Sequence, residues 1–325
     1  MKVFLYTTFA LVAFAFNSIL CRIALRGEEV DAAGFTAVRL VSGAVALVVV
    51  SYLVTKGGNL SGSEGVSRVA ENLDSGTKNT LPTGRVSALK KNTLPTGRVS
   101  ALEIHGSWAS AFFLFAYAVC FSFAYLGLTA GTGALILFGS VQMTMVAAAV
   151  VKGERPVPLE WIGLVVAVGG LVYLVFPGLA SPPLVSSLLM AAAGMSWGFY
   201  SIRGRTSGDP LANTTGNFVR SLPFAVVLAL LFLPNLHLTT RGILFAVLSG
   251  ALSSGVGYTV WYAAIKFHTA TRAAVLQLAV PVIAALAGVF VLSEIANMRL
   301  GIAGLLILGG IALTMVSRKK LTQSR

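Results

Sequence analysis

Ten long apolar stretches constrain the fold of this chain more than any other feature of its sequence. A helix needs about 20 apolar residues to cross the ~30 Å hydrocarbon core of a bilayer, and every stretch approaches that length. They lie near 3–21, 33–54, 107–128, 131–151, 158–176, 184–202, 211–233, 241–264, 272–292 and 298–317. We therefore predict an all-α, polytopic membrane protein with ten transmembrane helices.

The composition supports a membrane protein and excludes a soluble globule. Of the 325 residues, 56% are hydrophobic and 11% are charged, whereas soluble domains carry roughly 25% charged residues. The net charge is +13, but the 24 basic residues form no continuous stripe, so we expect no nucleic-acid partner. The two cysteines, Cys21 and Cys120, lie inside apolar stretches and predict neither a disulfide framework nor a zinc site.

The distribution of basic residues predicts the orientation. With the N-terminus in the cytoplasm, twelve Lys and Arg residues outside the long loop at 57–106 fall on the cytoplasmic side and four fall on the other side. Lys and Arg are concentrated in cytoplasmic loops. We therefore expect a multi-pass protein of the cell (inner) membrane with both termini in the cytoplasm, which agrees with an even number of spans.

The two halves of the chain resemble each other at constant shifts. A shift of 140 residues aligns Gly131–Glu154 with Thr271–Glu294 and places Gly169-Gly170 on Gly309-Gly310. A shift of 181 places Arg22 on Arg203 and Arg39 on Arg220. Chance alignment of apolar helices is the alternative interpretation. We predict two inverted five-helix repeats, because an odd number of spans reverses the second one: residues 1–176 and 184–317, followed by a basic cytoplasmic tail, 318–325.

The two shifts differ because the first repeat carries an insertion at about 57–106. This segment contains KNTLPTGRVSAL twice, at 78–89 and 91–102, and shows little apolar periodicity. We expect a disordered cytoplasmic loop. The duplication is typical of slippage in the coding DNA; a basic arm that touches anionic lipid headgroups is the functional alternative.

These patterns resemble the EamA-like family of the drug/metabolite transporter superfamily. In each half an alanine-rich helix ends at Gly-Glu154 or Ser-Glu294 before a glycine-rich helix, Pro281 lies inside the second of them, and Arg39 and Arg220 lie early in the second helix of their halves. The resemblance implies a secondary transporter, without ATP or a cofactor, that exports or exchanges a small metabolite through a central cavity by alternating access. The lipid bilayer and the metabolite are its expected partners, and a homodimer is an open alternative.

Two arginines within spans are candidates for the substrate pathway. An arginine at mid-membrane costs roughly 2.5 to 3.5 kcal/mol unless it is paired or reaches the interface. Arg39 and Arg220 therefore either hold an anionic cargo group or bond the carbonyl ends of neighbouring helices.

Other polar and aromatic side chains inside the spans are further candidates. An uncharged polar group in a span either bonds across helices or faces a wet cavity, and an aromatic residue near a helix end either lines the cavity or lies in the interfacial belt. The substrate-pathway candidates besides the arginines are Asn17, Gln142, Trp197, Tyr200, Asn217, Tyr258 and Gln277.

Acidic residues lie at helix ends and not at mid-membrane. We interpret Glu154 and Glu294 as gate or loop-anchoring residues. No coupling ion is assigned, because a proton relay needs a carboxylate or histidine that faces the cavity.

Other classes of protein fit the sequence less well. His105, His237 and His268 fall in loops or at helix borders without the spacing of metal ligands, so we predict no catalytic residues, no metal and no enzyme activity. A membrane sensor or scaffold that does not transport is the alternative function.

Overall fold

The computed structural model describes most of the chain as helix. The described residues are 2–76, 105–151, 153, 158–176, 181–204, 209–265, 267, 276–277, 279–295 and 297–322. They divide into two compact units, residues 1–47 with 105–325, and residues 48–104. In the described part of the chain the one extended pairing is an isolated antiparallel bridge between Val30 and Leu238. The prediction of an all-α protein is confirmed for these residues.

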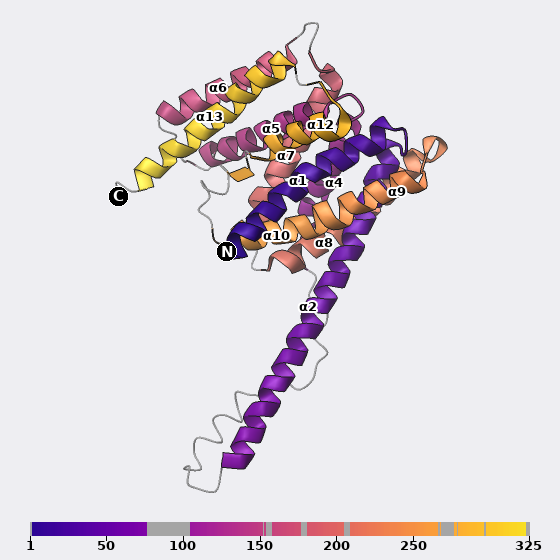
Figure 1. The fold of residues 1–325 in the computed structure, drawn as a ribbon, viewed down its shortest axis with the longest axis vertical. Helices are drawn as coiled ribbons and strands as arrows, with labels where there is room; N and C mark the ends of the chain where they lie inside the picture. Colours follow the sequence, from indigo (N-terminus) through magenta and orange to yellow (C-terminus); the bar gives the residue numbers. More distant parts are fainter. Residues whose placement is uncertain are drawn as a thin grey trace. The chain divides into compact units, whose positions relative to one another are not determined.

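Helices occupy the positions of the predicted spans in both halves of the chain (Figure 1). The helices of the first half are α1 (Lys2–Arg26), α2 (Ala32–Gly76), α4 (Trp108–Ala124), α5 (Ala130–Val151) and α6 (Pro158–Val175). Those of the second half are α7 (Leu184–Gly204), α8 (Pro210–Leu231), η1 (Leu233–Asn235), α9 (Thr240–Val247), η2 (Leu248–Val256), α10 (Gly257–Ile265), α12 (Ala279–Leu292) and α13 (Met298–Thr322). The π-helical η2 joins α9 and α10 into one span.

Local sequence explains where several helices begin. The side chains of Ser107, Asp209 and Thr239 precede α4, α8 and α9 and accept hydrogen bonds from backbone N–H groups of the first turn. These N–H groups have no partner within the helix, so a capping oxygen stabilises the helix start. Pro210 follows Asp209 at a position where its missing N–H costs nothing.

Two helix ends differ from the predicted bounds. Helix α2 continues to Gly76, so residues 57–76 are helical where we expected a disordered loop. Each residue added to a formed helix gains a hydrogen bond without a new nucleus, and no proline interrupts this segment. The duplicated segment 78–102 lies outside the described residues. Helix α13 continues to Thr322 into the predicted basic tail.

Apolar side chains cover the outside of the described helices. Val165 and Val172 on α6, Phe290 on α12 and Leu305 on α13 are all more than half exposed. Among the described residues, seven helices are long and apolar enough to cross a membrane, and three shorter apolar helices, residues 108–124, 279–292 and 298–313, occupy other predicted spans. Extensive exposed apolar surface is stable against lipid and not against water. The structure is therefore that of an integral membrane protein.

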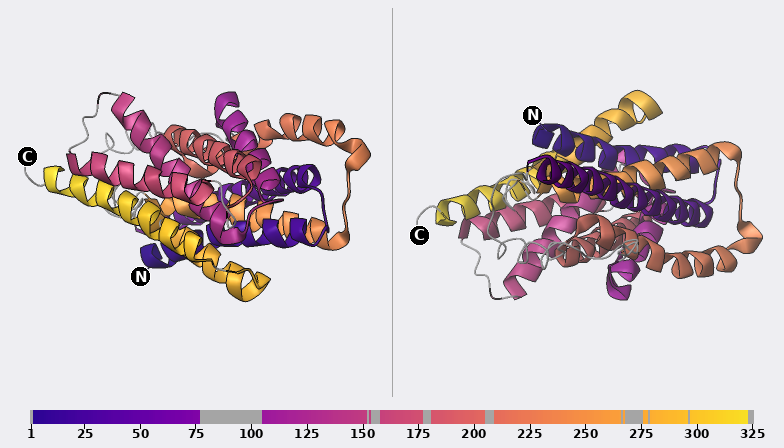
Figure 2. Two further views of the ribbon diagram at one scale, coloured as in Figure 1. Left: turned by 90° about the horizontal axis from the view of Figure 1, so that it is seen from above. Right: turned by 90° about the horizontal axis from the view of Figure 1, so that it is seen from below.

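Close helix pairs form around small residues. Helices α6 and α13 lie side by side (Figures 1 and 2). A Cβ added at Gly170 would press on Leu306 and Ile307, and one at Gly310 would press on the backbone of Gly163 and Ala167. Glycine thus lets the two backbones approach. Helix α7 similarly packs on α4 and α5, while α1 packs on α10 and α12.

Candidate functional site

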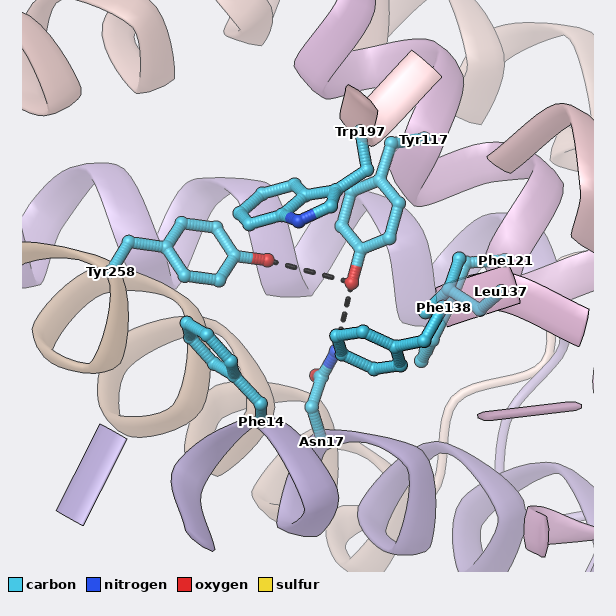
Figure 3. A pocket seen from close by; sticks show the side chains of 8 residues that line it. All are labelled: Phe14, Asn17, Tyr117, Phe121, Leu137, Phe138, Trp197 and Tyr258. Atoms are coloured by element: carbon cyan, nitrogen blue, oxygen red, sulfur yellow. Dashed lines mark hydrogen bonds between the residues drawn. The ribbon is translucent and has the colours of Figure 1, made fainter. Parts of the chain in front are cut away.

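A small cavity lies where helices from both halves of the chain meet. Its volume is about 20 Å³, and it is lined by Phe14, Asn17, Tyr117, Phe121, Leu137, Phe138, Trp197 and Tyr258 (Figure 3). These residues come from α1, α4, α5, α7 and α10. A cavity of this size holds about one water molecule. The lining is mostly aromatic, with the polar atoms of Asn17, Tyr117 and Tyr258 at its centre.

The Tyr117 hydroxyl is the hub of the polar centre. It lies 3.2 Å from Asn17 Nδ2 and 3.5 Å from the Tyr258 hydroxyl, both of which donate to it (Figure 3). Arg39 Nη2 donates to the same oxygen at 3.1 Å. A hydroxyl oxygen offers two lone pairs, so three donors compete for two acceptor positions.

Arg39 supplies a positive charge beside this hub. Its side chain is buried, with 1% of the residue exposed. Besides Tyr117 it donates to Ser254 Oγ at 3.1 Å and to the Tyr258 hydroxyl at 3.2 Å. The guanidinium carbon lies 4.9 Å from the centre of the Phe121 ring and 5.1 Å from that of Tyr117. Such cation–π contacts stabilise a desolvated cation in part.

One nitrogen of the Arg39 guanidinium makes no hydrogen bond within the described part of the chain. Arg39 Nη1 is buried and has no hydrogen-bond partner among the described residues. Two ion pairs between described residues, Arg22 with Glu294 and Arg241 with Glu29, do not involve Arg39. A buried charge without a counter-charge is costly, and this residue is the most polar group of the centre.

The π-helix η2 delivers two serines to the same place. Ser249 Oγ donates to Asn17 Oδ1 at 2.5 Å, and Ser254 Oγ accepts from Arg39. These serines are five residues apart, and a π-helix, with its i to i+5 hydrogen bonds, stacks such residues on one face. A Cβ added at Gly250 would overlap the carbonyl oxygen of Arg39, so η2 and α2 approach closely there.

Aromatic rings form the wall of the cavity. The Trp197 ring centre lies 4.6 Å from that of Tyr258 and 5.1 Å from that of Tyr117. Phe14 contacts Tyr258 edge-on at 5.7 Å. Tyr200 is buried one helical turn from Trp197, with ring centres 5.4 Å apart, and does not line the cavity. The wall is apolar, with hydroxyl groups at one edge.

Besides Tyr200 and Arg39, four predicted substrate-pathway residues are not among those that line the cavity. Asn217 donates to the Tyr200 hydroxyl at 3.5 Å and accepts from Ser107 N at 3.0 Å. Arg220 donates to the carbonyl oxygens of His105 and Gly216, at 2.8 and 3.1 Å. These contacts favour the structural interpretation of Arg220.

The remaining two are buried amides. Gln142 is 3% exposed, and its Nε2 has no partner among the described residues. Gln277 is 8% exposed.

Glu294 connects three segments near the C-terminal end of α1. Its Oε1 accepts from Arg22 Nε at 3.1 Å, and its Oε2 accepts from Ala130 N, at the start of α5, at 2.8 Å. Arg22 also donates to the Tyr125 carbonyl oxygen at 2.9 Å. Glu154 lies outside the described residues.

A second set of contacts lies just beyond α1. Asp31 Oδ2 accepts from His237 N at 2.9 Å, and Thr239 Oγ1 donates to Glu29 Oε2 at 2.6 Å. Together with the Glu294 contacts, we call these the α1-end contacts. They join the two halves of the chain at one end.

The sequence did not identify Tyr117, the centre of the hydrogen-bond network. It lies in the run WASAFFLFAYAVCFSFA, where apolar side chains point to every face and no periodic pattern marks the inner one. The signal that was present is the hydroxyl itself, because a buried tyrosine usually has a hydrogen-bond partner.

The fold and the apolar outer surface define a multi-span membrane protein with a central site. Residues 184–316 match the EamA-like transporter family. The chain is 42% identical over 317 residues to the uncharacterized protein PA1977 of Pseudomonas aeruginosa, covering 98% of this chain and 96% of that protein. The chain belongs to the EamA-like transporter family.

Two other likenesses are more distant. An uncharacterized transporter of Archaeoglobus fulgidus is 26% identical over 203 residues, which cover 60% of this chain and 70% of that protein. A solved crystal structure has the same fold, with a TM-score of 0.56 at 18% identity, over 95% of this chain and 97% of that chain.

Proposed function

We propose that the protein is a secondary transporter that exports or exchanges a small metabolite by alternating access across the cell (inner) membrane. Membership of the EamA-like family supports transport. The observation that carries the mechanism is the cavity at the meeting point of both halves, lined by Asn17 from one half and by Trp197 and Tyr258 from the other. Arg39 lies behind this lining and donates to the hydroxyls of Tyr117 and Tyr258. A site shared by two halves opens to either side when one half rocks against the other.

The pattern of helix neighbours supports two inverted five-helix repeats. If α1, α4, α5 and α6 correspond to α7, α9–α10, α12 and α13, then the α4–α7 contact corresponds to the α10–α1 contact, and α5–α7 to α12–α1. The α5–α12 and α6–α13 pairs map onto themselves. Gly170 and Gly310, which the 140-residue shift relates, both lie in the α6–α13 contact. In the described part of the chain, the seven long apolar helices and the three shorter ones match in number the ten spans that we propose.

The substrate pathway in this proposal centres on Arg39, Asn17, Trp197 and Tyr258, to which we add Tyr117. The α1-end contacts close the pathway at one side, which is the outer side if both termini are cytoplasmic. Glu294 is then a residue of the outer gate. The water-sized cavity fits a closed conformation, because a metabolite needs more room.

Flux across a lipid bilayer tests the proposal. The purified chain in liposomes should accumulate or release labelled organic solutes, whereas empty liposomes should not. Single cysteines in a Cys21→Ala/Cys120→Ala background, placed at each end, should change their reactivity in opposite directions when the transported solute is added. A sensor or scaffold, the alternative function, would bind a solute and give no flux. Ligand binding without flux in sealed vesicles of verified orientation would refute the proposal.

A further inference from the structure

The centre of the molecule has more hydrogen-bond donors than acceptors. Three donors, from Arg39, Asn17 and Tyr258, converge on the Tyr117 oxygen, which can accept two hydrogen bonds. Arg39 Nη1 is a further buried donor without a partner among the described residues. Buried donors of this kind cost free energy until an acceptor reaches them. An incoming group with several lone pairs would satisfy them.

A ligand that supplies the missing hydrogen-bond acceptor should carry a single negative charge. The chain has eleven Asp and Glu residues, and none lies midway along a predicted span. Arg39 therefore contributes one positive charge to the centre that no side chain in the described part of the spans balances. A monoanion balances this charge, whereas a dianion would leave a negative charge buried, and a cation would be repelled.

The rest of the site is suited to an apolar body. Phe14, Trp197 and Phe138 present rings and no charge to the cavity (Figure 3). The Asn17 oxygen already accepts from Ser249 and has one lone pair left, so it could accept at most one hydrogen bond from an ammonium group, which has three donors. Arg39 also lies against the faces of Tyr117 and Phe121, so a second cation close to them would meet its charge. The surroundings therefore disfavour an ammonium group.

We propose that the central site takes an organic monocarboxylate with an apolar, aromatic-sized body and no ammonium group. This inference rests on the proposed transport function and specifies its substrate class. The carboxylate accepts hydrogen bonds from Arg39 Nη1 and from the Tyr117 hydroxyl, whose own proton is turned away from its three donors. The body lies against Trp197 and Phe14. Because the cavity here holds about one water molecule, binding separates these rings.

A set of compounds that share one body tests the charge preference on the unmodified protein. 3-Phenylpropionate, 3-phenylpropionamide, phenylalanine, 3-phenylpropylamine and 3-phenylpropyl phosphate share the phenyl ring and its three-carbon chain and differ mainly in the polar end. Binding to the detergent-purified full chain is measured by titration calorimetry. We expect 3-phenylpropionate to bind at least about 10-fold more tightly than each of the others, the effect of a hydrogen-bonded charge. Equal or tighter binding of phenylalanine, the amine or the phosphate, or no binding of the carboxylate, would overturn the inference.

Two arginine variants then locate the preference. Arg39→Gln should remove the advantage of 3-phenylpropionate over its amide. Arg241→Gln, which removes an exposed guanidinium (81% exposed side chain), should retain it. Melting curves identify a variant that does not fold, and in that case the comparison of compounds on the wild type decides alone. Retention of the preference in a folded Arg39→Gln protein would contradict the assignment.

Flux measurements separate this inference from the proposed function. Selective binding of 3-phenylpropionate in vesicles that show no flux of any solute refutes transport and leaves the anion site. Flux of a neutral or cationic solute that Arg39→Gln does not change refutes the anion site and leaves transport.

Discussion

The Glu294→Gln substitution tests the role of the α1-end contacts. The carboxylate of Glu294 receives a hydrogen bond from Arg22 at 3.1 Å and one from Ala130 N at 2.8 Å, and its side chain is 7% exposed. Glutamine keeps one acceptor oxygen but loses the charge. A hydrogen bond to a charged group is worth roughly 1.5 to 3 kcal/mol, and a negative charge at a helix N-terminus adds about 0.3 to 1 kcal/mol.

We therefore expect the closed end to lose roughly 2 to 3 kcal/mol relative to the open one, because glutamine retains part of the interaction. Each 1.4 kcal/mol is a factor of ten, so the open population should rise roughly 30- to 150-fold. Leu128, which is 1% exposed beside these contacts, provides the reporter position. Leu128→Cys in the Cys21→Ala/Cys120→Ala background should react with a water-soluble maleimide faster by a similar factor when Glu294→Gln is added.

The matched control is Glu28→Gln, which removes a carboxylate at the same end. Glu28 is exposed, so its loss should leave the labelling rate within about twofold, as expected for a surface charge. If Glu294→Gln protein has an unchanged melting temperature and an unchanged labelling rate, the contacts do not hold this end closed, and the reasoning is wrong.

Three further substitutions probe the packing and the centre. Gly250→Ala should destabilise the fold by about 1 to 3 kcal/mol and lower the melting temperature, because the added Cβ overlaps α2. The control Gly169→Ala, whose Cβ meets nothing within 4 Å, should leave the melting temperature unchanged. Equal melting temperatures of the two variants would contradict the close approach of η2 and α2. Asn17→Ala should cost about 1 to 3 kcal/mol by leaving the Ser249 donor unpaired, measurable by thermal melting with Ser249→Ala as the background in which the loss is smaller. Trp197→Ala should weaken 3-phenylpropionate binding at least about 10-fold and retain the preference for carboxylate over amide, because it removes an aromatic ring and leaves the charge of Arg39. Unchanged affinity in calorimetry would exclude the Trp197 ring from the site.

The sequence predicted the parts of the structure that depend on local properties. The length of the apolar stretches predicts the helices, and the cost of burying a guanidinium identified Arg39 as a candidate. Arg39 is hydrogen-bonded to Tyr117 and Tyr258, which line the central cavity. The same argument could not separate Arg39 from Arg220. The cost of burying a guanidinium implies that other groups compensate its charge, but it does not identify those groups. For Arg39 they are aromatic rings and hydroxyls, and for Arg220 they are backbone carbonyl oxygens.

Features that depend on distant contacts were not predictable. Asn17 and Tyr117 are 100 positions apart in the chain, and α4 is apolar on every side, so its sequence does not show which face is inner. The extension of α2 past residue 56 follows glycine-rich sequence that shows no helical periodicity. The π-helical segment 248–256 has small residues that fit an ordinary α-helix equally well.

That π-helical segment has a consequence for comparing this protein with its relatives. A π-helical turn is wider than an α-helical turn, so the residues after Val256 are rotated about the helix axis relative to their positions in an unbroken α-helix. Because of this rotation, Tyr258 and Trp261 reach the interior. In a relative with one residue fewer between 248 and 256, the same two aromatic residues would face a different direction. Within this region, the length of the segment decides which side chains face the interior, and an alignment by residue type alone would pair residues that occupy different places in the fold.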